Sequence, residues 1–192
     1  ATLAEEPQPP KREFTLIAVG DVMLDRNVWK AIERSGYRSI LEKVREDVRE
    51  ADITFGNLEC PLSTVGPHSP SEHLLFRADP RSVQVLLDGG FDIVSLANNH
   101  TLNAGTDGLE QTLDHLEEAG VAYCGAQRDR ERSWEPCLFM EDGLVIGFVA
   151  ATDLSFEHGS CCKADEDLSK LKARLAAAAE KCDLLVASFH WG

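Results

Sequence analysis

The stretch FDIVSLANNH (residues 91–100) joins an apolar segment to three consecutive polar side chains. Residues 91–96 have the pattern of a short buried strand, and such strands usually end in Gly, Pro or Asp turns. Here the strand is followed by two amides and an imidazole, those of Asn98, Asn99 and His100. Their oxygen and nitrogen atoms suit a metal ion or a phosphate-like oxyanion. A helix-capping asparagine beside a surface histidine is the alternative explanation.

Three other predicted strands are also followed by polar side chains. These residues are Asp21 after the strand at 14–19, Asn57 and Glu59 after the strand at 52–55, and His190 after the strand at 183–189. Each residue taken alone could instead make turn or backbone hydrogen bonds. Because the carboxyl ends of parallel strands share one edge of a sheet, we expect the four groups to converge in space.

The predicted strands alternate with predicted helices along the chain. Helices are expected at 27–34, at 40–50, from Asp79 to Gly89, before Gly120 and at 165–181, with a hairpin at 137–150. This alternation predicts an α/β fold with a mainly parallel sheet that is layered with helices and covered on both faces. The length of 192 residues suits one domain. We expect residues 1–13, which are rich in Pro and charge, to be a flexible tether to a domain at 14–192.

The residue types at the predicted sheet edge favour a metal cofactor. Carboxylate, amide and imidazole groups are the ligands of Mn²⁺, Fe, Zn²⁺ and Mg²⁺ in proteins. A shared carboxylate such as Glu59 could bridge two ions, and two metals about 4 Å apart can activate water and stabilise a displaced oxygen. We therefore expect one divalent metal ion, or two, at this edge.

The charge balance restricts the class of partner. The chain has 33 acidic and 19 basic residues, which gives a net charge of −14. This balance argues against a nucleic-acid partner and against an anionic membrane surface, and it favours a bound cation. No run approaches the roughly 18 apolar residues of a membrane span. The chain begins with Ala1 and has no signal-peptide core. The tether could follow a lost export signal or anchor, which would place the protein at the cell envelope, or it could be an engineered end.

The six cysteines do not indicate a zinc knuckle, because no two of them have the C-x-x-C spacing. We expect most of them to be core thiols. Cys161 and Cys162 are the exception, because they lie in a polar loop. A redox-sensitive binding domain that uses this cysteine pair is therefore an alternative function.

Several motifs together resemble the capsule-synthesis CapA family, which is also described as the poly-gamma-glutamate biosynthesis family. The matching stretches are AVGDVM (18–23), ADITFGNLECPL (51–62), FRA (76–78), GFDIVSLANNH (90–100), GTDGLEQTLDHLEEAG (105–120) and HWG (190–192). The resemblance extends from Phe14 to the last residue. It implies a branch of the calcineurin-like metallophosphoesterase superfamily, with a four-layer α/β/β/α sandwich.

The resemblance also implies roles for particular residues. The metal ligands would be Asp21 for the first metal, Glu59 as a bridging or second-metal carboxylate, Asn99 for the second metal, and His190. His100 would protonate a leaving group or hold a phosphate-like oxygen. The residues expected to contact substrate are Asn57, Asn98 and Arg77.

The sequence departs from the family in two places. Asn103 stands where the family usually has Asp, so one carboxylate of the expected set is missing. The family also continues beyond the His-Trp-Gly motif into a second half with a Gly-His-His-Pro-His-type motif. We therefore expect this chain, as a fragment or a natural short form, to hold part of the ligand set.

Two functions from different classes follow from these features. The first is a metal-dependent phosphoesterase-like hydrolase of an envelope polymer pathway, acting on a phosphoester. The second is a non-catalytic accessory protein that binds an anionic polymer or a membrane synthase complex. The net charge of −14 disfavours direct capture of polyglutamate unless metal ions bridge the charges.

Overall fold

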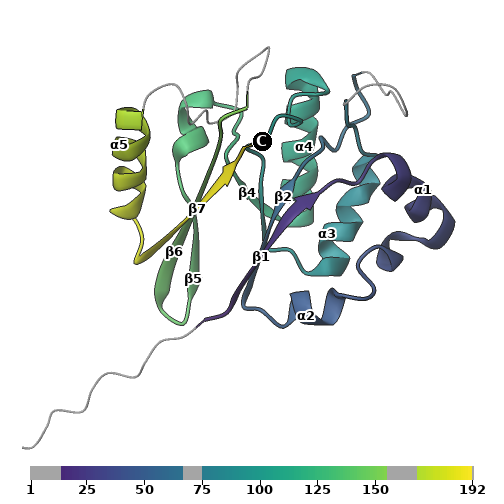
Figure 1. The fold of residues 1–192 in the computed structure, drawn as a ribbon, viewed down its shortest axis with the longest axis horizontal. Coiled ribbons are helices and arrows are strands. Elements are labelled where there is room, and N and C mark those ends of the chain that lie inside the picture. Colours follow the sequence, from purple (N-terminus) through teal and green to yellow (C-terminus); the bar gives the residue numbers. More distant parts are fainter. Residues whose placement is uncertain (1–13, 67–74, 155–167, 192) are drawn as a thin grey trace, which may run out of the picture.

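The computed structural model describes residues 14–66, 75–154 and 168–191. The predicted tether at 1–13 and the Cys161–Cys162 pair lie outside the described residues. Figure 1 shows the described elements as two β-sheets that lie side by side, with helices on their outer sides. Within these ranges no helix is both long enough and apolar enough to cross a membrane.

The first sheet is entirely parallel, as the sequence predicts. Its strands are β1 (Leu16–Val22), β2 (Ile53–Leu58), β3 (Ile93–Ser95) and β4 (Ala122–Cys124), in the order β1-β2-β3-β4. The connecting helices are α1 (Arg26–Ser35), α2 (Arg45–Arg49), α3 (Val83–Gly89) and α4 (Gly105–Ala119). Every residue of β2 and β3 is buried, as expected for the central strands of a parallel sheet that is covered on both faces.

The second sheet contains the predicted hairpin. It consists of β5 (Cys137–Glu141), β6 (Leu144–Thr152) and β7 (Leu184–His190), and α5 (Leu168–Ala179) precedes β7. β5 is antiparallel to β6, and β7 is parallel to β6. The hairpin turns at Asp142 and Gly143, which both have positive φ angles of 47° and 73°. An Asp-Gly pair favours a two-residue hairpin loop because its residues tolerate this left-handed conformation.

The elements form four layers, as the resemblance implies. In Figure 1, α5 lies outside the second sheet, the two sheets pack together, and α1, α3 and α4 lie outside the first sheet. The predicted parallel sheet, covered on both faces, is thus confirmed, with helices on its outer face and the second sheet on its inner face. The core between the sheets is built from alternate residues of the facing strands: Ile53 and Phe55 of β2, Ile93 of β3, and Ile146, Phe148 and Ala150 of β6.

A second core lies between the first sheet and its helices. Leu109, Leu113 and Leu116 of α4 pack there at helical spacing with Val85 and Leu86 of α3. The helix predicted at 40–50 is shorter than expected, since α2 covers only Arg45–Arg49. The guanidinium of Arg45 donates a hydrogen bond to the carbonyl of Arg38, which holds the preceding residues in a turn.

A β-bulge in β1 decides where Asp21 points. Ala18 faces Phe55 of β2, and Asp21 faces Asn57, so three steps along β1 match two steps along β2. Because neighbouring side chains on a strand alternate between the two faces, the extra residue puts Asp21 and Asn57 on the same face. The sequence analysis placed Asp21 and Asn57 just beyond their strands. In the structure both residues lie within them, Asp21 in β1 and Asn57 in β2.

Candidate functional site

The ends of β1, β2 and β7 meet at one place, although β7 belongs to the other sheet. The side-chain amide of Asn57 donates to Asp21 through Nδ2 and Oδ1, which are 2.7 Å apart. The same Nδ2 lies 3.3 Å from Nδ1 of His190. The structure thus brings together the carboxylate, amide and imidazole predicted at three separate strand ends.

The loop after β3 adds Asn98 to this group. Asn98 is completely buried, and its Nδ2 donates to Oδ1 of Asn57 at 3.0 Å and to the carbonyl of Leu58 at 2.9 Å. Its Oδ1 accepts from the backbone N–H of His100 and from the hydroxyl of Thr101. Buried amides need such partners, so Asn98 braces the loop against β2. Contact of Asn98 or Asn57 with a substrate stays a prediction.

Asn99 links the two histidines of the site. Its Nδ2 lies 2.9 Å from Nε2 of His100, and its Oδ1 lies 3.1 Å from Nε2 of His190. Asn99, His100 and His190 therefore converge, as the sequence predicts, even though His190 lies 91 positions from Asn99 in the chain.

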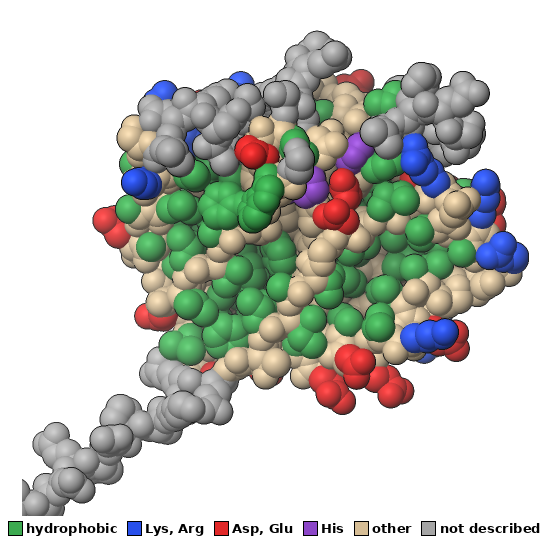
Figure 2. All heavy atoms as spheres, in the orientation of Figure 1, with side chains coloured by type: hydrophobic (Ala, Val, Ile, Leu, Met, Phe, Trp, Pro, Cys, Tyr) green, Lys and Arg blue, Asp and Glu red, His purple; other side chains and the backbone are tan. Residues whose placement is uncertain are grey.

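Glu59 completes the cluster between the histidines. Its Oε1 lies 3.6 Å from Nε2 of His100 and 3.8 Å from Nε2 of His190. On the other side of His190, Nδ1 lies 3.7 Å from Oδ1 of Asp21. The side chain of Asp21 is 51% exposed, whereas that of Glu59 is 14% exposed. The cluster is therefore buried at Glu59 and open to solvent at Asp21, and Figure 2 shows acidic and histidine side chains together on one face of the molecule.

The two carboxylates have opposite pKa shifts. Burial, together with a hydrogen bond to Asp21 and the charge of that residue, raises the pKa of Glu59 to about 7. For Asp21, burial alone would raise the pKa, but hydrogen bonds with Asn57 and Glu59 outweigh it and lower the pKa. Below about pH 7 the pair therefore holds a proton on Glu59 and a negative charge on Asp21, and a cation could replace that proton.

His100 is held from the side opposite the carboxylates. Burial lowers the pKa of His100, and a hydrogen bond with Asn103 opposes this shift. Oδ1 of Asn103 lies 2.8 Å from Nδ1 of His100 and accepts from the backbone N–H of Phe76 at 2.7 Å. The ring of Phe76 packs on the imidazole of His100 with centroids 4.0 Å apart. Nothing in the sequence pattern assigned Phe76 a role at the site, and the only signal for it was its place in the FRA motif at residues 76–78.

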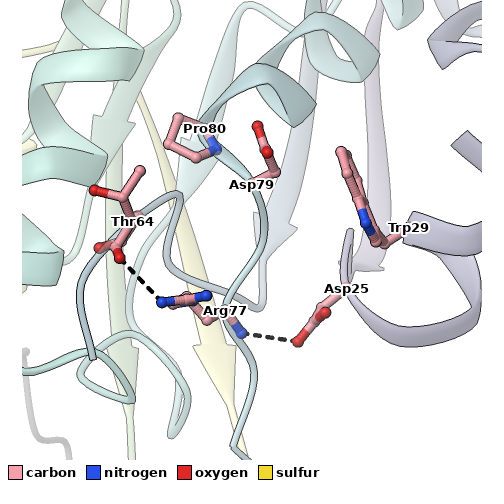
Figure 3. A pocket seen from close by; sticks show the side chains of 7 residues that line it. Asp25, Trp29, Thr64, Arg77, Asp79 and Pro80 are labelled. Atoms are coloured by element: carbon pink, nitrogen blue, oxygen red, sulfur yellow. Dashed lines mark hydrogen bonds between the residues drawn. The ribbon is translucent and has the colours of Figure 1, made fainter. Parts of the chain in front are cut away.

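Arg77 is placed apart from this cluster. Its guanidinium donates to the carbonyls of Thr64 and Gly66, and its backbone N–H donates to Asp25. Figure 3 shows these side chains around a neighbouring cavity of about 200 Å³, which Trp29 also lines. Asp25 is 2% exposed and caps α1, a role that the sequence reasoning missed. A substrate contact by Arg77 stays a prediction, and it would occur in this cavity.

The donor atoms suit a divalent cation in type, since carboxylate, amide and imidazole groups converge within hydrogen-bonding range. In the observed arrangement these side chains hydrogen-bond to one another. Among the described residues, no group of three or more His, Cys, Asp and Glu side chains is arranged to hold a metal ion. Cys60 points elsewhere: its buried sulfur accepts from the N–H of Leu24, and burial raises the pKa of its thiol to about 12.

The raised pKa of Glu59 predicts a pH dependence of stability in the metal-free protein. The ordinary pKa is 4.5, and the folded value is about 7, so the folded state binds this proton more tightly than the unfolded state. This contribution is fully present below pH 4.5 and is lost as the pH rises through about 7. We expect the Glu59→Gln variant, which has no proton to lose, to gain stability relative to the wild type over that interval. Urea denaturation across it checks this, and parallel curves for the two proteins would contradict it.

Comparison with known proteins identifies a family for this sequence. The model of the family "Bacterial capsule synthesis protein PGA_cap" matches residues 15–192. The chain is 27% identical over 187 residues to the PGA biosynthesis protein CapA of Bacillus subtilis, covering 91% of this chain and 48% of that protein. It is 24% identical over 192 residues to the capsule biosynthesis protein CapA of Bacillus anthracis, covering 94% and 47% respectively. The chain thus spans about half the length of these relatives.

A solved structure shows that the fold is shared more widely. A phosphatase from Mycoplasma pneumoniae superposes with a TM-score of 0.54 at 15% sequence identity, covering 93% of this chain and 56% of that one. At this identity the similarity concerns the fold alone. Because the family model matches nearly the whole sequence, the chain belongs to the bacterial capsule synthesis protein family PGA_cap.

Proposed function

We propose that this chain carries metal ligands of a metal-dependent, phosphoesterase-like hydrolase that acts in capsule or poly-gamma-glutamate synthesis. One divalent cation or two, of Mn²⁺, Zn²⁺, Fe or Mg²⁺, would be the cofactor, and a phosphoester the substrate. The names of the two Bacillus relatives support the pathway and a location at the cell envelope. The site geometry supports the chemistry.

The observation that carries the proposal is the spacing between the imidazole nitrogens and the carboxylate oxygens. Three such pairs, two at Glu59 and one at Asp21, are separated by 3.6–3.8 Å. Two atoms bound to one ion at about 2.0–2.2 Å each lie at most about 4.4 Å apart. The His100–Glu59 pair and the His190–Asp21 pair could therefore each share a cation after small side-chain movements. Without a cation, these distances are too long for hydrogen bonds.

Each residue has a distinct part in this proposal. Asp21, Glu59, Asn99 and His190 would hold the metal. The bound ion would supply Lewis-acid stabilisation and a water of lowered pKa. Asn57 and Asn98 keep the ligands in place through the hydrogen bonds described above. His100, with Nε2 facing Glu59, could move a proton near the reacting group.

An assay on the chain as it stands tests the proposal. We expect the Mn²⁺-loaded protein to hydrolyse p-nitrophenyl phosphate or bis(p-nitrophenyl) phosphate, and a chelator or the Glu59→Gln substitution to abolish this activity. His115→Gln is the matched control, because it also removes a histidine paired with a glutamate, but one on α4 that is not part of the cluster. Metal binding without hydrolysis of either compound would overturn the hydrolase proposal for this chain and favour the accessory, polymer-binding function. Binding of poly-gamma-glutamate with and without Mn²⁺ would then be measured.

A further inference from the structure

A continuous series of side-chain hydrogen bonds runs through both histidines of the site. Its two ends rest on backbone groups, whose roles are fixed because a backbone N–H only donates and a carbonyl only accepts. The positions of the amide hydrogens and ring protons between the two ends can therefore be assigned from the network.

The first end is the backbone N–H of Phe76. It donates to the side chain of Asn103 at 2.7 Å, so the facing atom must be the amide oxygen. The same oxygen lies 2.8 Å from Nδ1 of His100. Because an amide oxygen cannot donate, Nδ1 must carry the proton. In the neutral ring Nε2 then has a lone pair, which faces Nδ2 of Asn99 at 2.9 Å.

The second end lies around Asn98. Its oxygen accepts from the N–H of His100 at 3.0 Å, and its nitrogen donates to the carbonyl of Leu58 at 2.9 Å, so its orientation is fixed. That nitrogen also faces Oδ1 of Asn57 at 3.0 Å. The oxygen of Asn57 is thus an acceptor, and its nitrogen is the donor to the Asp21 carboxylate.

The orientation of Asn57 determines the ring of His190. The nitrogen of Asn57 lies 3.3 Å from Nδ1 of His190, so Nδ1 must offer a lone pair. The proton of the neutral ring then lies on Nε2, which faces the oxygen of Asn99 at 3.1 Å. Traced from either end, the series gives the same orientation for Asn99, with its nitrogen toward His100 and its oxygen toward His190. Rotating one amide would leave two donors or two acceptors facing each other in a buried site, which is costly.

We propose that His100 and His190 are held as opposite tautomers, with the protons on Nδ1 of His100 and Nε2 of His190, and that Asn103 is the positioning residue that fixes His100. The unprotonated nitrogens are then Nε2 of His100, which accepts from Asn99 and lies 3.6 Å from Oε1 of Glu59, and Nδ1 of His190, which accepts from Asn57 and lies 3.7 Å from Oδ1 of Asp21. A cation could bind at either nitrogen, beside its carboxylate, by displacing the amide hydrogen bond.

This assignment sharpens the role of His100. Because Nε2 is unprotonated, the neutral ring of His100 can accept a proton or a cation at this atom, beside Glu59, and cannot donate there to a leaving group. Asn103 favours this tautomer without bringing a negative charge to the site. A carboxylate at the same position could accept the same hydrogen bonds from Phe76 and His100, but it would also add a negative charge. The tautomers follow from the hydrogen bonds alone. Only the use of the two lone pairs rests on the proposed function.

Nitrogen NMR of the metal-free protein with ¹⁵N-labelled histidine tests the inference. Long-range ¹H–¹⁵N correlations distinguish protonated from unprotonated ring nitrogens, and His100→Gln and His190→Gln variants assign the signals. At a pH where the rings are neutral, we expect unprotonated nitrogen shifts for Nε2 of His100 and Nδ1 of His190. A wild-type His100 protonated on Nε2 would overturn the assignment without any variant.

Two substitutions test the positioning role of Asn103. Asn103→Leu removes the acceptor of the Nδ1 proton and leaves only the Asn99 amide to favour the Nδ1–H form of His100, so a measurable share of the Nε2–H form should appear, with the signals of both ring nitrogens moving toward each other. Asn103→Asp keeps the acceptor and should keep the wild-type tautomer. Unchanged His100 signals in a folded Asn103→Leu protein, or a changed tautomer in Asn103→Asp, would refute the role. Because these spectra are recorded without metal, their outcome is independent of whether the chain binds metal or hydrolyses phosphoesters.

Discussion

Replacing His190 with Ala is expected to lower the affinity of the chain for Mn²⁺ by about 100-fold or more. Loss even of an outer partner of a metal ligand costs roughly 10–100-fold, and His190 is proposed as a ligand itself. Its two ring nitrogens lie 3.7 Å from the Asp21 carboxylate and 3.8 Å from the Glu59 carboxylate, so its removal opens a gap between both. The expected loss thus reflects both a missing ligand and two carboxylates left without their neighbour.

Isothermal titration calorimetry measures this affinity directly. His115→Ala is the matched control, because it removes an imidazole whose Nδ1 lies 3.9 Å from Glu118 on the surface of α4. We expect the control to bind Mn²⁺ as the wild type does. Equal affinities for His190→Ala and the wild type would show that β7 does not contribute to the metal site.

Replacing Phe148 with Ala is expected to lower the free energy of unfolding by about 3–5 kcal/mol, the range found when large aromatic side chains are removed from cores. Phe148 of β6 is fully buried between the sheets. Its ring stacks on that of Phe55, with the ring centroids 5.8 Å apart, and makes an edge-to-face contact with the ring of Phe139, with the centroids 5.6 Å apart. The substitution would leave a cavity that the two sheets can close only by moving closer together.

Urea denaturation gives the size of the effect. Met140→Ala on β5 is the control, since Met140 is 75% exposed and should change stability by no more than about 0.5 kcal/mol. Asp21 and His190 come from different sheets, so a movement of one sheet relative to the other would change the distance between them. We therefore expect Phe148→Ala also to weaken Mn²⁺ binding. A Phe148→Ala protein as stable as Met140→Ala would contradict the placement of this core.

The parts of the fold that depend on local pattern could be predicted from the sequence. The β-branched and aromatic residues of β2 and β3 predict strands, and the spacing of Leu109, Leu113 and Leu116 predicts a helix, because burial favours these patterns. The hairpin follows from its Asp-Gly turn. The division into two sheets could not be predicted from periodicity alone, since a buried strand has the same composition whichever sheet it joins. The family resemblance supplied that information.

The convergence of the site was predictable for a similar reason, but its details were not. Residues at the carboxyl ends of parallel strands must share an edge, so Asp21, Asn57 and Asn99 were expected together. The direction of Asp21 depends on a bulge that shifts the register of β1 by one residue. The side chain of Arg77 turns into a neighbouring cavity because Thr64 and Gly66 offer carbonyl groups there. Register and loop contacts of this kind arise only from the folded chain.

Metal content is the measurement that tests the central claim most directly. The wild-type chain and an Asp21→Asn, Glu59→Gln double variant would each be loaded with Mn²⁺ or Zn²⁺, dialysed extensively and analysed by mass spectrometry, with circular dichroism to show that both are folded. The account predicts roughly stoichiometric metal in the wild type and none in the variant, because both carboxylates of the cluster are then neutral. A folded wild-type chain that retains no metal would contradict the metal site.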